Sequence, residues 1–495
     1  MEYEKNYSCI EKNEKVFSKN IDIEQDFSES IPAYCDDIYR IVKCLSHSFI
    51  TSVSVSSNEI LIFGKTEIML TYYNESSCLC YADFDEEFSR NINVENLSDY
   101  AFACADICDK YTNFRVINQR RIDVHSSAVI NLNVYDRIKY PCLLDCNGAK
   151  LNKQGIKSSD IIAFNISKIE FDEEFSLPST SSELKRIISS NCSAYLTETK
   201  IIKDKALIKA DIDFEILYTV GDEDEIQSVR NTVSVSKIID QSSIDDGDIS
   251  ISNVTVGDVF QKAKAVSGDN LDTIEVFGEI EVSTLFIREN ENAYITDGYI
   301  PKRKCECSYS DYKLITNGRE LKDNSVFNVA TDFSSDIKEI KEVSVNLSTV
   351  NMRNSKLVSK VDISIIYENE SDSLASMNST SEIEYDLKGA ENAFAAFNLK
   401  SLDYALPSSK RVEIRLNVDI NGYAFDERNI KILSDIESDD EEIDSPSITI
   451  YFAKQSDTVW DIAKSFSSDE EMIKKENNLQ NSVIDKDRIL IIPRV

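Results

Sequence analysis

The sequence predicts a mainly β protein with three tandem antiparallel β-rich modules and a small strand–helix–helix–strand domain at the C-terminal end. Two observations carry this prediction. Two strand-like segments each recur three times along the chain, and the last 48 residues change to a helical spacing of apolar residues. A chain of 495 residues is also too long for a single hydrophobic core, so several units are expected.

The first recurring segment alternates apolar and polar residues, is rich in Ile, Val and Leu, and reaches a tyrosine near its end. Period-two alternation is typical of a strand with one buried face. Taking Tyr72, Tyr218 and Tyr367 as equivalent gives spacings of 146 and 149 residues. The three copies of the segment are Ile60–Tyr73, Ala206–Tyr218 and Lys356–Tyr367.

The second recurring segment opens with an apolar–acidic–apolar triplet, and its copies are spaced by 152 and 138 residues. They are Arg120–Tyr135, Thr273–Phe286 and Lys410–Tyr423. Two independent segments with nearly the same period predict modules at residues 1–150, 151–300 and 301–433.

Further stretches with strand-like composition are expected to complete antiparallel sheets that bury one face. These are Val16–Ile23, Ile166–Phe171, Asn231–Ile239 and Ser381–Leu387. The spacing at Glu183–Ile188 instead predicts a short helix at one end of a sheet.

Residues 434–447 hold seven acidic residues, no basic residue and one proline, which predicts a solvated acidic linker. The same run has the charge to dock on a basic partner, and this alternative stays open.

The last domain, residues 448–495, has nearly balanced charge. A strand at Ile448–Ala453 is expected to lead into Asp457 as a helix N-cap, and a capping box of Ser468 and Glu471 is expected to start a second helix through about Asn477. A final strand is expected at Arg488–Ile492. The first helix would bury one apolar stripe, made of Val459, Ile462, Ala463 and Phe466.

The net charge of −34 disfavours nucleic acid and anionic membrane surfaces as partners and favours a basic protein surface. The start of the chain has no basic and apolar signal pattern, and no run of about 18 apolar residues occurs. A cytoplasmic location without membrane insertion is therefore expected.

Catalytic and metal chemistry is not expected, and neither is a cofactor. Only two histidines are present, His47 and His125, and 12 glycines leave little material for phosphate-binding loops. The 12 cysteines include the pairs Cys78/Cys80 and Cys305/Cys307, but their spacing lacks two zinc knuckles. Unpaired thiols, a metal site and late oxidative cross-linking stay open for them.

The C-terminal segment YFAKQSDTVWDIAKSF, followed by the IKKENNL and IDKDRILIIP segments, resembles a LysM domain. The matching residues are Asp457, Thr458, Trp460, Ile462, Ala463, Asn477, Leu479, Leu490, Ile492 and Pro493. The resemblance implies a shallow groove for N-acetylglucosamine-containing glycan or a protein partner, formed by Ser456, Asp457, Thr458, Val459, Asn481, Ser482, Val483 and Ile484.

Two positions depart from the LysM pattern. Ser456 stands where the family usually has glycine, and Lys486-Asp487 replaces its Gly-Gln. The loss of a glycine at the groove edge weighs against glycan binding, because close approach of a ligand to the backbone favours glycine. Trp460, the single tryptophan, is expected to serve core packing.

Three modules of this kind before a LysM domain resemble the SPOCS-domain proteins of spore-forming clostridia, and among them the SipL-type spore coat morphogenetic proteins. The segments Val116–Val124 and Tyr294–Glu306 resemble signatures of that domain. The resemblance implies a non-enzymatic scaffold for spore coat assembly on the forespore surface in the mother cell, which binds the coat's basement-layer ATPase. A peptidoglycan-binding protein of the cell wall or spore cortex is the alternative, and a hydrolase with a wall-binding tail is a third.

Overall fold

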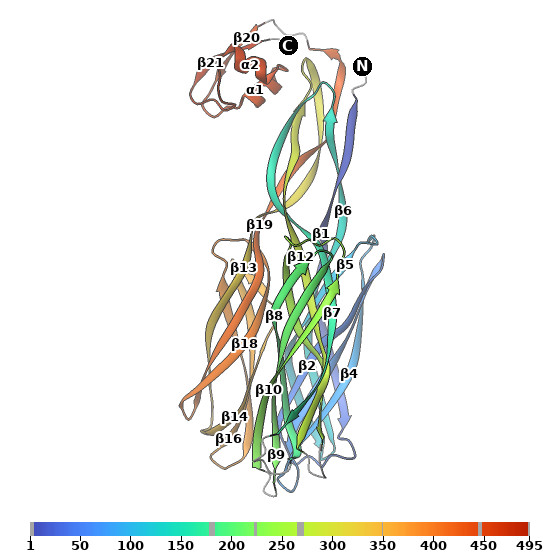
Figure 1. Cartoon of the computed structure of the whole chain (residues 1–495), viewed down its shortest axis with the longest axis vertical. Coiled ribbons are helices and arrows are strands. Elements are labelled where there is room, and N and C mark those ends of the chain that lie inside the picture. Colours follow the sequence, from blue (N-terminus) through green and yellow to red (C-terminus); the bar gives the residue numbers. More distant parts are fainter. Residues whose placement is uncertain are drawn as a thin grey trace.

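The structure is a computed structural model that describes residues 4–177, 184–221, 225–264, 272–348, 350–443 and 448–493. Strands make up 79% of it and helices 3%, which confirms the predicted mainly β class. Figure 1 shows a body of long strands, a narrower stalk that rises from it, and a small helical domain beside the stalk tip.

The body contains three units, each made of two antiparallel sheets that face one another. In every unit the first strand, the last strand and the strand before the last pair with one another, and the strands between them form the other sheet. The first kind of sheet is continuous between the second and third units, because β7 also pairs with β13 and makes one six-stranded sheet. The first unit contains β1 (Lys5–Ser30), β2 (Arg40–Val55), β3 (Glu59–Tyr73), β4 (Leu79–Asn93), β5 (Phe102–Asn118) and β6 (Arg121–Cys146). The second contains β7 (Lys150–Ser176), β8 (Leu184–Ile202), β9 (Lys205–Val220), β10 (Glu225–Asp240), β11 (Ile249–Lys264) and β12 (Thr273–Tyr299). The third contains β13 (Arg303–Asp332), β14 (Ile337–Leu347), β15 (Asn351–Arg353), β16 (Lys356–Asn369), β17 (Leu374–Asp386), β18 (Asn392–Ser408) and β19 (Arg411–Glu442).

Both recurring segments are central strands. The first segment forms β3, β9 and β16, and the second lies in β6, β12 and β19, each with a partner on both sides. The predicted helix at Glu183–Ile188 is wrong: residues 184–188 begin β8, and Glu183 lies outside the described residues. Leu184 and Ile188 are both buried, and two register shifts in the β8–β9 pairing leave Arg186 between them exposed, so the pattern imitates the i, i+4 spacing of a helix.

Irregularities in strand pairing recur opposite equivalent residues of the three units. Val42, Ile188 and Lys341 are each an extra residue opposite the equivalent tyrosines of β3, β9 and β16. A second irregularity lies immediately after Val134 of β6, Phe286 of β12 and Ala424 of β19. These three residues are 152 and 138 residues apart, as are the copies of the second recurring segment. A bulge bends a strand and increases its twist, so the three units share their local shape as well as their strand order.

The three units meet at a shared apolar cluster that none of them could bury alone. It consists of Val42, Leu79, Ile188, Leu217, Ile366 and Leu374, with Tyr73 and Ile226 packed against it. Beside this cluster Lys43 of β2 forms an ion pair of 2.8 Å with Glu342 of β14. The repeat places Ser189 at the equivalent position of the second unit, and this residue is also buried.

The stalk consists of the long ends of β1, β6, β7, β12, β13 and β19 (Figure 1). It has its own core, including Tyr294, Tyr312, Leu314 and Ile432. The acidic run predicted to be a solvated linker is strand as far as Glu442 and pairs with β13. Burial of Leu433 and Ile436 on β19 and an ion pair of 2.8 Å from Lys5 to Asp435 explain this correction.

Gly278 of β12 is expected to be intolerant of a side chain. The bulge of β11 at residues 256–259 lies against it, and a Cβ at Gly278 would come 2.2 Å from the carbonyl oxygen of Asp258. Gly278→Ala should therefore lower the free energy of unfolding by about 1–3 kcal/mol, measured by urea denaturation. Gly155→Ala is the control, because nothing lies within 4 Å of a Cβ there. Equal midpoints for the two variants would contradict the close approach.

Candidate functional site

The C-terminal domain has the predicted strand–helix–helix–strand order. Its elements are β20 (Ile448–Ala453), α1 (Val459–Ser465), α2 (Glu470–Glu476) and β21 (Arg488–Pro493). Both predicted N-caps are displaced by one residue. Thr458, rather than Asp457, accepts a hydrogen bond from the Asp461 N–H, and Asp469, rather than Ser468, accepts one from the Met472 N–H. Asp457 instead accepts from the Lys454 N–H and the Tyr451 hydroxyl, while Ser468 donates to the Pro493 carbonyl.

The predicted groove segments, 456–459 and 481–484, lie against each other. The Ser456 N–H donates to the Ile484 carbonyl at 2.9 Å, the Ile484 N–H to Asp457 at 2.8 Å, and the Val459 N–H to Ser482 at 2.8 Å. Thr458 and Val483 form an isolated bridge between the two segments. The structure therefore brings together the two loops that the LysM resemblance selected.

The side chains of these two segments divide into core and surface. Val459 and Ile484 are buried in the domain core with Leu490 and Ile492, so their side chains are not available to a ligand. Ser456, Asn481, Ser482 and Val483 are exposed. Ser456 has a φ of +77°, a backbone region that favours glycine, because Cβ is crowded there. The serine thus keeps the backbone shape of the family's glycine while adding a side chain at the groove edge.

A surface that the sequence analysis did not identify lies on the outer face of the two-stranded sheet. β20 presents Ile448, Ile450 and Phe452 to solvent, and Phe452 is 72% exposed. The strand pairing places Ile450 opposite Ile491 and Phe452 opposite Ile489, both of which are exposed as well. We call these five residues the apolar sheet face. This surface could have been found from the sequence, because β20 and β21 both carry apolar residues on the face toward the core and on the face toward solvent.

Trp460 joins the C-terminal domain to the stalk. Its indole N–H donates to Asp297 Oδ2 at 2.9 Å, and Lys464, one turn later in α1, contacts Asp297 Oδ1 at 2.5 Å. The ring of Tyr299 meets the Trp460 ring edge-on, with centroids 5.2 Å apart. Trp460 is thus a packing residue as predicted, but it packs at the boundary with the stalk as well as in the domain core.

Asp297 is the centre of this junction. It also accepts hydrogen bonds from the Tyr309 hydroxyl at 3.0 Å and the Gly298 N–H at 2.9 Å. Burial by itself would raise the pKa of Asp297, but the hydrogen bonds from Lys464, Trp460, Tyr309 and Gly298 outweigh it, so the pKa lies below the ordinary 3.8.

Three further contacts fix the orientation of the domain. Tyr299 donates its hydroxyl to the Ser468 carbonyl at 2.9 Å, Lys150 forms an ion pair of 2.6 Å with Asp469, and the Lys302 N–H donates to Ser467 at 3.0 Å.

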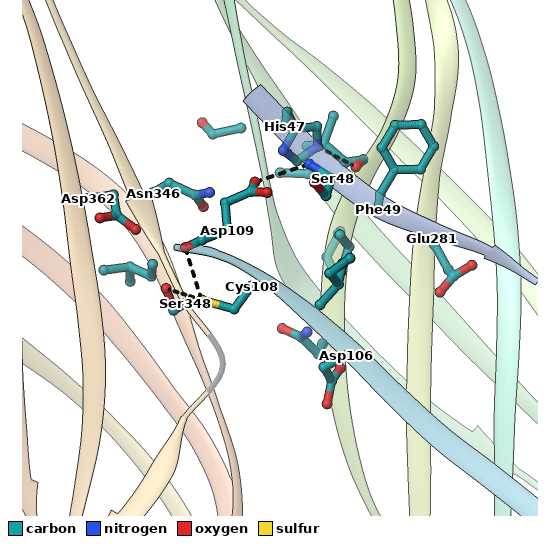
Figure 2. A pocket seen from close by; sticks show the side chains of 18 of the residues that line it. His47, Ser48, Phe49, Asp106, Cys108, Asp109, Glu281, Asn346, Ser348 and Asp362 are labelled. Atoms are coloured by element: carbon teal, nitrogen blue, oxygen red, sulfur yellow. Dashed lines mark hydrogen bonds between the residues drawn. The ribbon is translucent and has the colours of Figure 1, made fainter. Parts of the chain in front are cut away.

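A partly open cavity of about 1090 Å³ lies between the three units of the body. Figure 2 shows His47, Asp106 and Asp109 of the first unit, Glu281 of the second, and Asn346 and Asp362 of the third around this space. Burial raises the pKa of Asp106 to about 6 and that of Glu281 to about 7, and it also raises the pKa of Asp109. No sequence pattern could identify this cavity, because its walls come from strands far apart along the chain.

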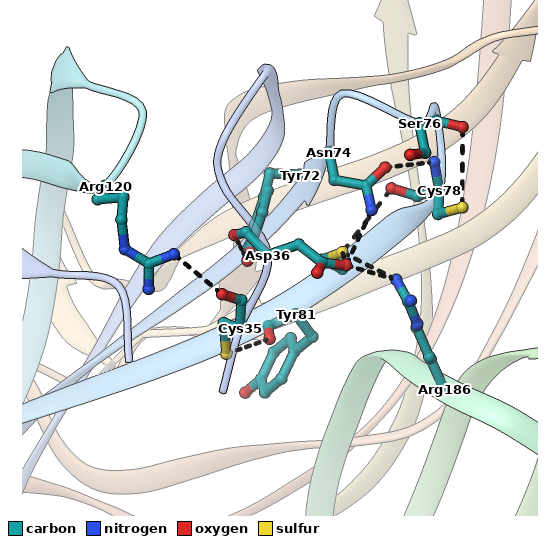
Figure 3. A network of polar contacts seen from close by, with 10 residues as sticks. Cys35, Asp36, Tyr72, Asn74, Ser76, Cys78, Tyr81, Arg120 and Arg186 are labelled. Carbon is teal, nitrogen blue, oxygen red and sulfur yellow. Dashed lines mark hydrogen bonds and ion pairs between the residues drawn. The ribbon is translucent and has the colours of Figure 1, made fainter. Parts of the chain in front are cut away.

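A polar network lies where the first and second units meet (Figure 3). Arg186 of β8 lies 3.1 Å from Asp36 Oδ2 and 3.2 Å from Cys80 Sγ. Asn74 donates to the same Asp36 oxygen at 2.8 Å, and this bond is the main cause that lowers the Asp36 pKa. Burial raises the pKa of Cys80 to about 11, which makes it a poor nucleophile at neutral pH.

The cysteines are free thiols, and Cys44, Cys80, Cys142 and Cys146 are buried. Within the described ranges, no three His, Cys, Asp or Glu side chains converge in a way that could hold a metal ion. His125 lies on an exposed strand surface between Glu24 and Asp26, at 3.0 and 2.8 Å. In the same ranges no helix is long and apolar enough to span a membrane.

Comparison with protein-family models gives two matches. Residues 183–264 match the model described as SipL, SPOCS domain, and residues 451–493 match the LysM domain. Neither a curated protein nor a solved structure matches the chain. The chain therefore carries a SipL-type SPOCS domain and a C-terminal LysM domain, as the sequence resemblance predicted. The first indicates a sporulation protein, and the second indicates binding of peptidoglycan or a related glycan.

Proposed function

We propose that this chain is a non-enzymatic scaffold of spore coat assembly that works in the mother cell at the forespore surface. In this proposal the LysM domain docks on a protein, the morphogenetic ATPase of the coat's basement layer. The observation that carries the proposal is the apolar sheet face, Ile448, Ile450, Phe452, Ile489 and Ile491. A contiguous exposed apolar surface is typical of a protein interface, whereas sugars are commonly held by polar groups and aromatic platforms.

The position of the LysM domain supports this role. The contacts of Trp460 and Lys464 with Asp297 hold α1 against the stalk, so the helix side of the domain is occupied. The apolar sheet face remains exposed with the domain docked in this way. A domain held at the tip of a stalk can reach a partner that the acidic body itself does not contact.

Glycan binding is the second candidate, and the LysM match favours it. The groove segments 456–459 and 481–484 are assembled as that function would require. Ser456 at the groove edge weighs against it, because its side chain occupies space where glycine would let a sugar approach the backbone.

Two variants of the full chain separate these functions. Ile450→Thr with Phe452→Thr makes the apolar sheet face polar at exposed strand positions and places threonine, a residue that favours strands, at both. Asn481→Ala with Val483→Ala changes the exposed groove instead. Each tagged variant is used to capture proteins from sporulating cells, which are then identified by mass spectrometry, and each is incubated with purified sacculi.

The proposal predicts that the wild-type chain and the groove variant, Asn481→Ala with Val483→Ala, capture the coat ATPase. The amount of ATPase captured by the sheet-face variant, Ile450→Thr with Phe452→Thr, should be at least tenfold lower. Sacculi that retain the wild-type chain but not the groove variant, without capture of any coat protein, would establish the glycan alternative. Equal capture of the ATPase by both variants would show that the apolar sheet face is not the docking surface.

A further inference from the structure

The cavity between the three units is too large to be an ordinary packing defect. Protein interiors are packed as densely as organic crystals, and most of their voids are no larger than a water molecule. Its volume of about 1090 Å³ corresponds to the upper end of small-molecule sites, which span about 300–1,000 Å³. Strands of all three units line it, so the cavity exists only in the assembled body.

Its walls carry carboxylates without a cation. Asp106 and Asp109 of β5 and Glu281 of β12 form no ion pair with any residue of the described ranges. One oxygen of Asp109 accepts from the Ser48 N–H at 3.0 Å, and the other is inaccessible to solvent and has no hydrogen-bond partner. A buried polar atom without a partner costs free energy, and a ligand that donates a hydrogen bond would remove this cost.

Four lysines line the cavity; Lys110, Lys168 and Lys360 form ion pairs with other carboxylates, and Lys15 forms none within the described ranges. Lys168 contacts Glu279 at 2.5 Å, and Lys360 contacts Asp362 at 2.8 Å and the carbonyl oxygen of Asp109 at 3.1 Å. His47 faces Asp109, and its Nε2 lies 3.2 Å from the Val256 carbonyl. These groups leave the cavity with an excess of negative charge near Asp106, Asp109 and Glu281.

The arrangement of the carboxylates selects the kind of cation. A divalent metal ion needs several ligands around one point, and no such grouping exists in the described ranges. The three carboxylates instead stand on separate parts of the wall (Figure 2). The wall between them includes apolar side chains such as Phe49, Ile107 and Val259. Ammonium groups joined by methylene segments would fit both features.

We propose that the cavity binds a small linear organic polycation, a diamine or triamine, with its ammonium groups at Asp106, Asp109 and Glu281. Each ammonium offers three donors, which can satisfy the free oxygen of Asp109 as well as neutralise charge. The site goes beyond the proposed scaffold function and does not depend on it, because it lies in the body rather than in the LysM domain.

Binding is expected to weaken as the pH falls from 8 to 6. Burial raises the pKa of Asp106 to about 6. Burial also raises the pKa of Glu281 to about 7; the positive charge of Lys168 opposes this rise, and the negative charges of Asp106 and Glu279 add to it. At pH 8 both carboxyls are charged and attract the amine. At pH 6 much of this charge is lost to protonation, so the polycation has to displace protons to bind.

Isothermal titration of the full chain with spermidine tests the proposal. We expect saturable binding to one site at pH 8 and at least tenfold weaker binding for the variant Asp106→Asn with Glu281→Gln. The matched control is Asp172→Asn with Glu173→Gln, which removes two charges from the exposed surface of β7 and should leave the affinity unchanged. A thermal melt of each variant checks folding, and neutralising two half-buried carboxylates should not lower the melting temperature.

Three outcomes would overturn the proposal: no saturable binding by the wild-type chain, an equal loss of affinity in the surface control, or equal competition by Mg²⁺ at the same ionic strength. The last two would show that spermidine only screens the net charge of −34.

Discussion

Lys43→Met is expected to lower the free energy of unfolding of the body by about 3–5 kcal/mol, because it leaves the Glu342 carboxylate buried without a counter-charge. The two groups are 2.8 Å apart, and their side chains are 8% and 0% exposed. The second oxygen of Glu342 has no hydrogen-bond partner, so among the described residues Lys43 is the one group that pairs with this carboxylate. Urea denaturation followed by circular dichroism at pH 8 measures the change.

Two controls make this result specific. The double variant Lys43→Met with Glu342→Gln removes both charges and should recover most of the lost stability. Lys205→Met breaks an exposed ion pair with Asp240 and should change stability by less than about 1 kcal/mol. If Lys43→Met were no more damaging than Lys205→Met, the ion pair would not contribute to the joining of the first and third units.

Asp297→Ala is expected to detach the LysM domain from the stalk. It removes the acceptor of both Trp460 and Lys464, and two hydrogen bonds to a partly buried carboxylate are worth about 2–4 kcal/mol together. Trp460 is the single tryptophan of the chain, so its fluorescence reports on this junction alone. We expect emission at longer wavelength and stronger quenching by acrylamide, while the β-rich circular dichroism of the body stays unchanged.

The pH dependence of this junction follows from the lowered pKa of Asp297. A carboxyl with a folded pKa below its ordinary value stabilises the docked state above pH 3.8, and this stabilisation is lost as the pH falls through the folded value. Asp145→Asn, at an exposed position in the same stalk, should leave the fluorescence unchanged. A wild-type spectrum for Asp297→Ala would mean that Tyr299 and Lys150 hold the domain without Asp297.

The sequence allowed prediction of the features that depend on local pattern. Alternation in Ile60–Tyr73 and its two copies identified the central strands, and the LysM motif identified four elements to within a few residues. The bulges were beyond prediction, because an extra residue such as Val42 is defined only by the strand opposite it. The same reason explains the error at Ile188, where two bulges imitate a helical period.

The linker error has a different physical cause. Charge density in residues 434–447 predicts solvation, but Ile436 gains burial in the stalk core while Asp435 meets Lys5 and Tyr7 from the opposite end of the chain. The candidate groove was predictable from its motif. The cavity and the contact of Trp460 with Asp297 were not, because both depend on how separate units pack.

The nested strand order sets the sequence of events during synthesis. Lys5 of β1 lies opposite Cys146 of β6, and Lys150 of β7 lies opposite Tyr299 of β12, so each unit can close only after its last strand has been made. Pairing over such long separations is slow. The stalk needs β19, the last strand of the body, and the LysM domain follows it in the chain. The LysM domain is therefore made last, and its contacts with Asp297 and Tyr299 of β12 can form only after all the strands of the body have been synthesised.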